Sequence, residues 1–308
     1  MKKSFGLGLL IVMFVCSCAS KKPIPGIEKL NQPSTAWYAP DKVAFDGRLQ
    51  VIAFNIEQGP YWKDVVKYVA GKKQEIPATI VLVSEADRMH SRSGDVYVAD
   101  EMAKALKMNM VYATEFIEYN DKTPETPGET GNAILSAFPL SDITVIRQVD
   151  VYSWTRWGFL QGQPRKGERV AIGATALLPN GKRVRVYVVH LENYGTSSAR
   201  AKQMEQVLDD AKKYDLPVVV GGDYNEPPGG QIFTVIKKYG FENSLAGNHQ
   251  PTGACVAIAG KLKCSTKIDW QVNKGLTVQD KTVDYPLASN GRNISDHAPV
   301  RVIYGIRN

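Results

Sequence analysis

The sequence contains few cysteines and few histidines. It has 4 of each among 308 residues, and two of the cysteines, Cys16 and Cys18, lie in an apolar N-terminal segment. The remaining two, Cys255 and Cys264, cannot supply the four ligands of a structural zinc site. An oxidising compartment permits a disulfide between them, and we predict that they form one.

The sequence also lacks an apolar run that would span a membrane comfortably. A transmembrane helix needs about 20 apolar residues, whereas the stretch at residues 5–15 is shorter and follows Lys2 and Lys3. A short basic segment, an apolar segment and small residues together form the pattern of an export signal. We therefore expect residues 1–17 to be a signal peptide.

The end of this signal resembles a bacterial lipobox. Ser17 stands directly before the acceptor position, which Cys18 occupies. We expect a lipid anchor at Cys18 that attaches the exported protein to a membrane. Ala19 and Ser20 follow in place of an aspartate, which favours the outer membrane or the cell surface. Plain secretion, in which Cys18 is only a small residue near the cleavage site, is the alternative.

The excess of positive charge is small. The formal net charge of +7 suits a phosphate-bearing partner, but it is equally consistent with ordinary solubility. Residues 18–47 are rich in Pro, Lys and Ser and have no apolar periodicity, which predicts a flexible tether. No repeat or second linker interrupts residues 48–308, so we expect them to form one domain, and we expect a monomer.

Apolar runs bounded by turn residues indicate buried strands, and stretches with helical spacing lie between them. Strands covered by helices predict a layered α/β architecture. Periodicity alone does not separate one doubly wound sheet from two stacked sheets. The predicted strands are residues 49–54, 80–84, 133–136, 170–178, 184–190, 217–221 and 298–304, and the predicted helices are residues 96–107, 198–214 and 230–239.

Polar side chains end the first two predicted strands. Asn55 and Glu57 share one face of the first strand because side chains alternate, and either could offer an oxygen to a cation. Glu85 ends the second strand, where an ionised carboxylate is costly unless it is paired or metal-bound. Asn55 and Glu85 are therefore candidate metal ligands, although an Asn also starts turns and a strand-end Glu also caps helices.

Acids and histidines end three later strands. A glycine pair precedes Asp223 and Asn225 and allows close backbone approach there. Asp296 and His297 stand just before the last strand, and His190 ends another apolar strand. A lone histidine in such a strand is more often a satisfied core residue. The acids and amides at the other strand ends are what make these positions candidates for a site.

These segments resemble, in kind and in order, the motifs of the endonuclease/exonuclease/phosphatase superfamily, to which deoxyribonuclease I belongs. The resemblance covers residues 48–308. It is carried by Asn55, by Glu85, by the central-strand segment 131–136, by Gly-Asp-x-Asn at 222–225, by Ile-Asp at 268–269 and by Ser-Asp-His at 295–297.

The resemblance implies a four-layer α/β/β/α sandwich of two packed mixed β-sheets, with a site at one rim. It also implies a phosphoesterase that depends on Mg²⁺ or Mn²⁺. In that family the equivalents of Asn55 and Glu85 bind the metal, and we expect Asp296 to assist. The expected substrate is a phosphodiester or a phosphomonoester, with nucleic acid among the candidates.

The resemblance further implies how the remaining residues act. Asp269 orients His297, which serves as the base, while Asp223 and Asn225 place the attacking water and the transition state. His190 contacts a phosphoryl oxygen. One branch of the family pairs this second histidine with a glutamate, for which the sequence offers only Glu129 as a weak candidate.

Other functions fit the same motifs. A sphingomyelinase-like or inositol-phosphatase-like lipid phosphoesterase and an inactive surface binding protein are the alternatives. The segment 152–159 mixes aromatic residues with Arg156, and Arg165, Lys166 and Arg169 follow it. Such a loop could stack on bases, dip into a lipid interface or simply cover the core.

Overall fold

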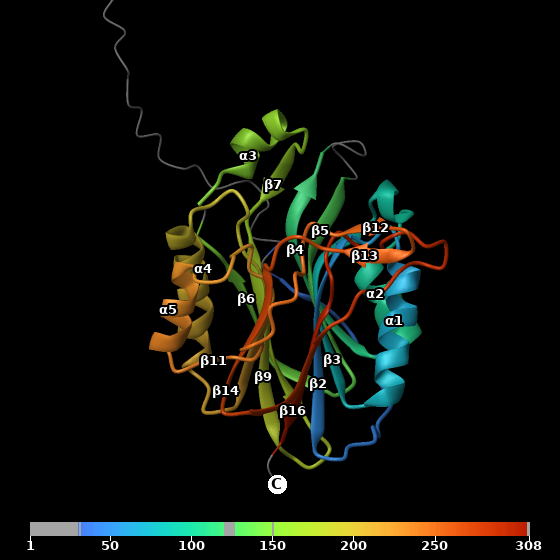
Figure 1. The fold of residues 1–308 in the computed structure, drawn as a ribbon, viewed down its shortest axis with the longest axis vertical. Helices are drawn as coiled ribbons and strands as arrows, with labels where there is room; N and C mark the ends of the chain where they lie inside the picture. Colours follow the sequence, from blue (N-terminus) through green and yellow to red (C-terminus); the bar gives the residue numbers. More distant parts are fainter. Residues whose placement is uncertain (1–29, 31, 120–126, 150, 307–308) are drawn as a thin grey trace, which may run out of the picture.

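Two mixed β-sheets pack face to face and are covered by helices on both sides (Figure 1). The computed structural model describes residues 30, 32–119, 127–149 and 151–306. In Figure 1, α4 and α5 lie on one side of the paired sheets and α1 and α2 on the other. The arrangement confirms the predicted four-layer sandwich.

The first sheet has the strand order β1-β4-β5-β3-β2-β16-β15, with β7 also paired to β4. Its centre is parallel, since β2 pairs parallel with β3, and its other pairs are antiparallel. The strands are β1 (Ser34–Ala36), β2 (Arg48–Gln58), β3 (Thr79–Arg88), β4 (Asn109–Glu118), β5 (Gly128–Ser136), β7 (Arg165–Gly167), β15 (Thr277–Val283) and β16 (Val300–Gly305).

The second sheet has the order β11-β14-β10-β9-β8-β6, with β9 and β10 parallel. A separate hairpin pairs β12 with β13. The strands are β6 (Leu140–Arg147), β8 (Val170–Leu177), β9 (Arg183–His190), β10 (Val218–Asp223), β11 (Glu242–Asn243), β12 (Val256–Ile258), β13 (Lys261–Lys263) and β14 (Asp269–Lys274).

The helices cover the outer faces of the sheets. Side chains of α1 and α2 pack on the first sheet, and those of α4 and α5 pack on the second. Short helical turns lie at the upper end of the molecule in Figure 1. The helices are α1 (Trp62–Glu75), α2 (Val98–Leu106), α3 (Trp154–Trp157), α4 (Ser197–Ala211) and α5 (Gln231–Lys238), with 3₁₀ turns η2 (Ser91–Ser93) and η3 (Gly158–Gln161).

The two-residue period of β2 explains why its whole length is apolar. Val51 and Ala53 pack between the two sheets, whereas Ile52 and Phe54 pack under α1 and α2. A strand with an apolar layer on each face must be apolar at every position. The other predicted strands and helices also each match one element of the structure, within a few residues at their ends.

The predicted tether needs a correction. β1 is an edge strand paired with the start of β4, and the Tyr38 hydroxyl donates to Asp100 Oδ1 at 2.8 Å. The chain therefore packs on the domain from Ser34 onward, well before residue 48. The predicted signal peptide, the predicted lipid attachment at Cys18 and the start of the predicted tether lie outside the described residues. Among the described helices, none is both long and apolar enough to cross a membrane.

The predicted disulfide between Cys255 and Cys264 is confirmed. It joins the residue before β12 to the residue after β13 and so closes the base of the hairpin. The hairpin is attached to the rest of the fold through the backbone, because Cys255 N donates to Asp296 O at 2.8 Å. The bridge therefore lies next to one of the predicted site residues.

Candidate active site

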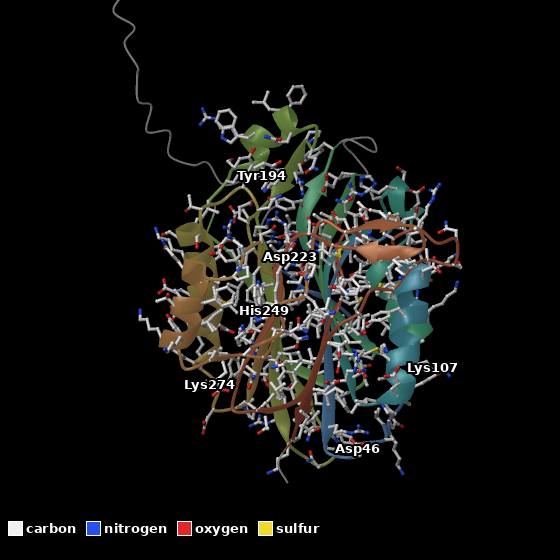
Figure 2. All side chains as sticks on the ribbon, in the orientation of Figure 1. Asp46, Lys107, Tyr194, Asp223, His249 and Lys274 are labelled. Carbon is white, nitrogen blue, oxygen red and sulfur yellow. A yellow bond between two sulfur atoms is a disulfide. The ribbon has the colours of Figure 1, made fainter. Side chains whose placement is uncertain are left out.

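Three predicted site residues stand in one row across the second sheet. β10 pairs with β9 so that Asp223 is opposite His190, and it pairs with β14 so that Asp223 is opposite Asp269. Asp223 thus occupies the middle of the row, in the upper part of the molecule in Figure 2. Strand register alone brings these side chains, which are distant in the sequence, to one place.

The residue before Asp223 has to be glycine. Gly222 has φ 142°, and a Cβ there would collide with the carbonyl oxygen of Val189 on the neighbouring strand. Only glycine adopts this backbone without strain while β10 stays paired with β9. The glycine of the predicted motif therefore serves to place the Asp223 carboxylate.

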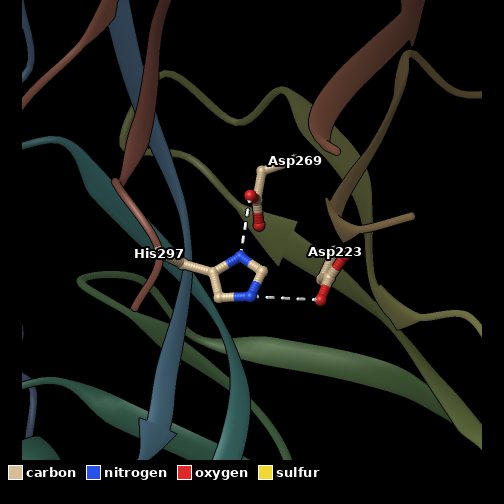
Figure 3. A group of neighbouring side chains, drawn as sticks. All are labelled: Asp223, Asp269 and His297. Carbon is tan, nitrogen blue, oxygen red and sulfur yellow. Dashed lines mark hydrogen bonds and ion pairs between the residues drawn. The ribbon is translucent and has the colours of Figure 1, made fainter. Parts of the chain in front are cut away.

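His297 lies between two carboxylates (Figure 3). Its Nδ1 is 2.8 Å from Asp269 Oδ2, and its Nε2 is 3.7 Å from Asp223 Oδ2. All three side chains are buried. Burial would lower the pKa of His297, but the negative charges of Asp269 and Asp223 outweigh burial and hold that pKa well above its usual value.

Backbone contacts hold His297 and Asp269 in position. The Ser295 hydroxyl accepts from His297 N at 3.0 Å and donates to Asn55 O at 2.7 Å. The Thr252 hydroxyl accepts from Asp269 N at 2.9 Å. Ser295 therefore ties the His297 loop to β2, and Thr252 ties the start of β14 to the segment that leads into the disulfide hairpin.

Asn55 and Glu85 come from the first sheet and face this row. Asn55 Nδ2 donates to Glu85 Oε1 at 3.2 Å and to Asp223 Oδ2 at 3.1 Å. Burial would raise the pKa of Glu85, but His190, His297 and other nearby positive charge outweigh burial and lower it to about 2. Glu85 is therefore an anion at neutral pH.

Two further carboxylates lie beside Glu85. Burial raises the pKa of Glu57, and the charges of Asp296 and Glu85 raise it further. Burial likewise raises the pKa of Asp296, to which Glu85 and Asp223 also contribute. Carboxylates that repel one another across a solvent-facing rim are a donor set suited to a hard divalent cation. A half-turn of the Asn55 amide would add its carbonyl oxygen to the set.

A second group of donors competes with this assignment. Asp223, Asp269 and His297 have potential ligand atoms that all lie within 4.8 Å of one another. However, the 2.8 Å contact to His297 Nδ1 already engages Asp269, and Mg²⁺ prefers oxygen ligands and keeps several waters. Asn55, Glu85 and Asp296 therefore remain the predicted ligands of the cation.

His190 is buried among charged groups. Its Nδ1 is 3.3 Å from Glu115 Oε2, and its Nε2 is 3.6 Å from Glu85 Oε1 and 3.7 Å from Asp223 Oδ2. Arg169 Nη1 lies 2.8 Å from Nδ1 and 2.9 Å from Nε2. The structure thus brings His190 to the same carboxylate as His297, from the opposite side.

Asn225 completes the predicted set. Its backbone N donates to Asp223 Oδ1 at 2.8 Å, and its side-chain Nδ2 donates to Leu191 O at 2.9 Å. It has φ 48°, the left-handed conformation that Asn tolerates better than most residues. Asn225 therefore fixes the orientation of the Asp223 carboxylate.

Glu129 is not the glutamate partner of His190. Thr114 donates to Glu129 at 2.5 Å, and Arg88 lies 3.7 Å from it. The partner is Glu115 in β4, which the sequence analysis missed although an acid inside an apolar strand was a visible signal. Arg169 was noted only as part of a basic segment. It also lies 3.3 Å from both Glu115 and Glu192, so it neutralises two buried acids.

The comparisons with known proteins agree with this geometry. The chain matches the Endonuclease/Exonuclease/phosphatase family over residues 52–297, and it belongs to that family. The match supports a hydrolase that acts on phosphoesters. No curated protein sequence matches the chain significantly.

Several solved structures share the fold. The catalytic domain of human Nocturnin with bound sulfate is 15% identical (TM-score 0.61) and covers 90% of this chain and 99% of its own. A mannosyl-6-phosphatase from Bacteroides thetaiotaomicron is 16% identical (TM-score 0.59), and the match covers 82% of this chain and 98% of the phosphatase. A family member from Beutenbergia cavernae is 17% identical (TM-score 0.58), and the match covers 84% of this chain and 72% of the other. At such low identities the likeness establishes the fold alone.

Proposed function

We propose that the protein is a divalent-cation-dependent phosphoesterase that hydrolyses phosphodiester or phosphomonoester bonds. The observation that carries this proposal is the line from Asp269 through His297 to Asp223, with His297 Nδ1 2.8 Å from one acid and Nε2 3.7 Å from the other. Because Nδ1 is engaged by Asp269, Nε2 is the atom that faces the reaction.

Each residue of the triad has a separate task. Asp223, fixed by Asn225, orients a water. His297 Nε2 accepts the proton of that water as it attacks phosphorus, and only molecules whose His297 imidazole is neutral can do so, because Asp269 and Asp223 raise its pKa. Asp269 stabilises the positive charge that His297 then carries. His190, with Arg169 behind it, contributes positive charge where a phosphoryl oxygen gains negative charge.

Glu85, Asp296 and Asn55 would hold Mg²⁺ or Mn²⁺. When bound there, the cation would neutralise charge that develops on the phosphoryl oxygens and polarise phosphorus. The site residues themselves place the water, remove its proton and exclude bulk solvent from the buried triad.

The substrate class stays open between nucleic acid, lipid headgroups and small phosphate esters. The similar structures include a mannosyl-6-phosphatase and Nocturnin, which differ in function. We also propose that the protein is exported, acts as a monomer and is anchored through Cys18 to the outer membrane or the cell surface.

The test is an activity screen of the purified full chain with Mg²⁺ or Mn²⁺. The substrates are plasmid DNA, RNA, sphingomyelin, an inositol phosphate, a sugar phosphate and bis-nitrophenyl phosphate. Asp223→Asn is the matched control, since it keeps the shape of the side chain. We expect turnover that chelation and Asp223→Asn both abolish. Turnover that survives either treatment rejects the mechanism, and nucleic-acid binding without hydrolysis of any substrate favours an inactive binding protein.

A further inference from the structure

One end of the molecule carries an unusually exposed apolar segment. We call residues 154–161, which form α3 and η3, the tip. Phe159 is 77% exposed and Leu160 72%, the two highest values among the large apolar side chains that the structure describes, and Trp157 is 42% exposed. Three large apolar side chains so close together on a protruding turn indicate a contact surface.

The charged residues in the sequence of the tip and its flanks are all basic, although Arg165 is paired with Glu118 at 3.7 Å. Residues 151–167 contain Arg156, Arg165 and Lys166 and no Asp or Glu. The Arg156 guanidinium lies 5.0 Å from the centre of the Trp157 ring. Aromatic side chains with one polar end, flanked by cations, are favoured at the boundary between lipid tails and anionic headgroups.

The root of the tip is firmly packed. Trp154 is buried, and its Nε1 donates to Glu192 Oε2 at 2.9 Å. Arg165 lies 3.9 Å from the Trp154 ring centre on one side, and Phe116 packs edge to face at 5.9 Å. One aromatic residue of α3 thus anchors the turn in the domain, while Phe159 and Leu160 remain exposed.

The tip is connected to the rim of the candidate active site. Glu192, which accepts from Trp154, also accepts from Arg169 at 3.3 Å, and Arg169 contacts His190. In Figure 2, Tyr194 lies between the tip and Asp223. A surface that receives the tip would therefore lie near the mouth of the site.

The first described residue lies at this end as well. Leu30 O accepts from Arg147 Nη2 at 2.6 Å, and Arg147 Nη1 donates to Glu168 O at 3.1 Å, directly after β7. Cys18 precedes Leu30 by a stretch that spans at most about 40 Å when extended. A lipid anchor at Cys18 would thus hold this end of the domain within reach of the membrane.

We propose that the tip docks on a lipid bilayer that contains anionic lipid, with Trp157, Phe159 and Leu160 inserted among the headgroups and Arg156 paired with lipid phosphate. Docking in this orientation directs the mouth of the site toward the membrane surface. The proposal goes beyond the proposed function, because it holds for any phosphoester that reaches the site.

The test uses tryptophan fluorescence of the full chain on vesicles of equal parts phosphatidylglycerol and acyl-chain-brominated phosphatidylcholine. Bromine quenches only indoles that enter the bilayer, so the readout reports the position of the tip even when an anchor holds the protein. Trp157→Phe removes the reporter. Trp37→Phe is the matched control, because Trp37 is 55% exposed but follows β1, which pairs near the opposite end of β4 from β7.

We expect brominated lipid to lower the absolute emission of the unmodified chain and of Trp37→Phe by the same amount, and Trp157→Phe to lose most of this decrease. Replacing Phe159 and Leu160 together by Ser should weaken the quenching without unfolding the domain, since both side chains are exposed. Equal quenching in Trp157→Phe, or none in the unmodified chain, overturns the proposal. So does a Trp157 emission change on adding a single-stranded oligonucleotide but not lipid, which would assign the tip to nucleic acid.

Discussion

The two histidines of the candidate site approach one carboxylate from opposite sides but are held in different ways. His297 and His190 each place Nε2 3.7 Å from Asp223 Oδ2. On the His297 side, a single acid, Asp269, contacts Nδ1 at 2.8 Å. On the His190 side, a buried arginine lies within 2.9 Å of both ring nitrogens.

This difference suggests different roles: His297 is placed for proton transfer, and His190 for holding positive charge at the site. A histidine with one ring nitrogen bonded to an acid keeps the other for exchanging a proton with water. A histidine packed against Arg169 and Glu115 is part of a buried ion network, in which each charge depends on the others. The His297 side should therefore control turnover, and the His190 side should control both stability and charge at the site.

The largest expected effect is on the His297 side. His297→Ala removes the proposed base, so kcat should fall by a factor of about 10² to 10⁴. KM should change little, because binding does not depend on the base. The measurement is initial rates on bis-nitrophenyl phosphate at saturating Mg²⁺, with His249→Ala as the control, since His249 is exposed. If His190→Ala and His297→Ala both fold and both lower kcat by the same factor, the two histidines do not have different roles.

The next effect concerns stability on the His190 side. Arg169→Met removes the buried guanidinium that lies 3.3 Å from both Glu115 and Glu192, and removing one partner of such a pair costs about 3–5 kcal/mol. The free energy of unfolding in urea measures it. Arg48→Met is the control, because Arg48 forms an exposed pair with Asp46 and should cost less than about 1 kcal/mol. Equal stability of the two variants would show that the His190 network is not held by charge.

Glu85 lies between the two histidines and is a proposed ligand of the cation. Replacing it should therefore weaken cation binding and leave the contact between His297 and Asp269 intact. Glu85→Gln keeps the volume of the side chain but removes a negative ligand. The Mg²⁺ concentration that gives half-maximal activity should therefore rise by a factor of about ten or more. Excess Mg²⁺ should restore much of the rate. Asp269→Asn should not be rescued, because it disturbs His297 and not the cation. A Mg²⁺ titration of both variants decides this, and rescue of Asp269→Asn would instead place the cation on the buried triad.

The sequence predicts most of the fold because its central strands are apolar on both faces. β2, β3, β9 and β10 were found from their apolar runs. α1 was missed because only Val65 and Val69 are buried along it, which leaves little helical periodicity. β1 was missed because a three-residue edge strand inside a polar segment has no pattern of its own.

The site was predictable where one strand end carries its own signal. Asp223 follows a glycine pair, and His297 follows Asp296, so local sequence marks both. The glutamate partner of His190 could not be assigned from the sequence, which offered only Glu129 as a weak candidate, because Glu115 reaches His190 from the other sheet. Contacts of that kind depend on how the sheets pack, which no local pattern encodes.

The smallest expected effect on turnover comes from the disulfide, which lies on the His297 side of the site. Replacing Cys255 and Cys264 together by Ser opens a short loop and should lower the free energy of unfolding by about 2–3 kcal/mol. The same segment supports the site, because Ala298 N donates to Thr252 O at 2.6 Å and Cys255 N donates to Asp296 O at 2.8 Å.

Loss of this brace should reduce kcat only a few-fold, because the contacts of Ser295 to β2 remain. The measurement is urea unfolding and initial rates on the same preparation, with the Trp157 quenching as a reporter of the opposite rim. The quenching should not change, since β12 and β13 lie apart from α3 in Figure 1. A large fall in kcat at unchanged stability would mean that the hairpin orients His297 directly, whereas a change at the tip would mean that the two sides of the site are not independent.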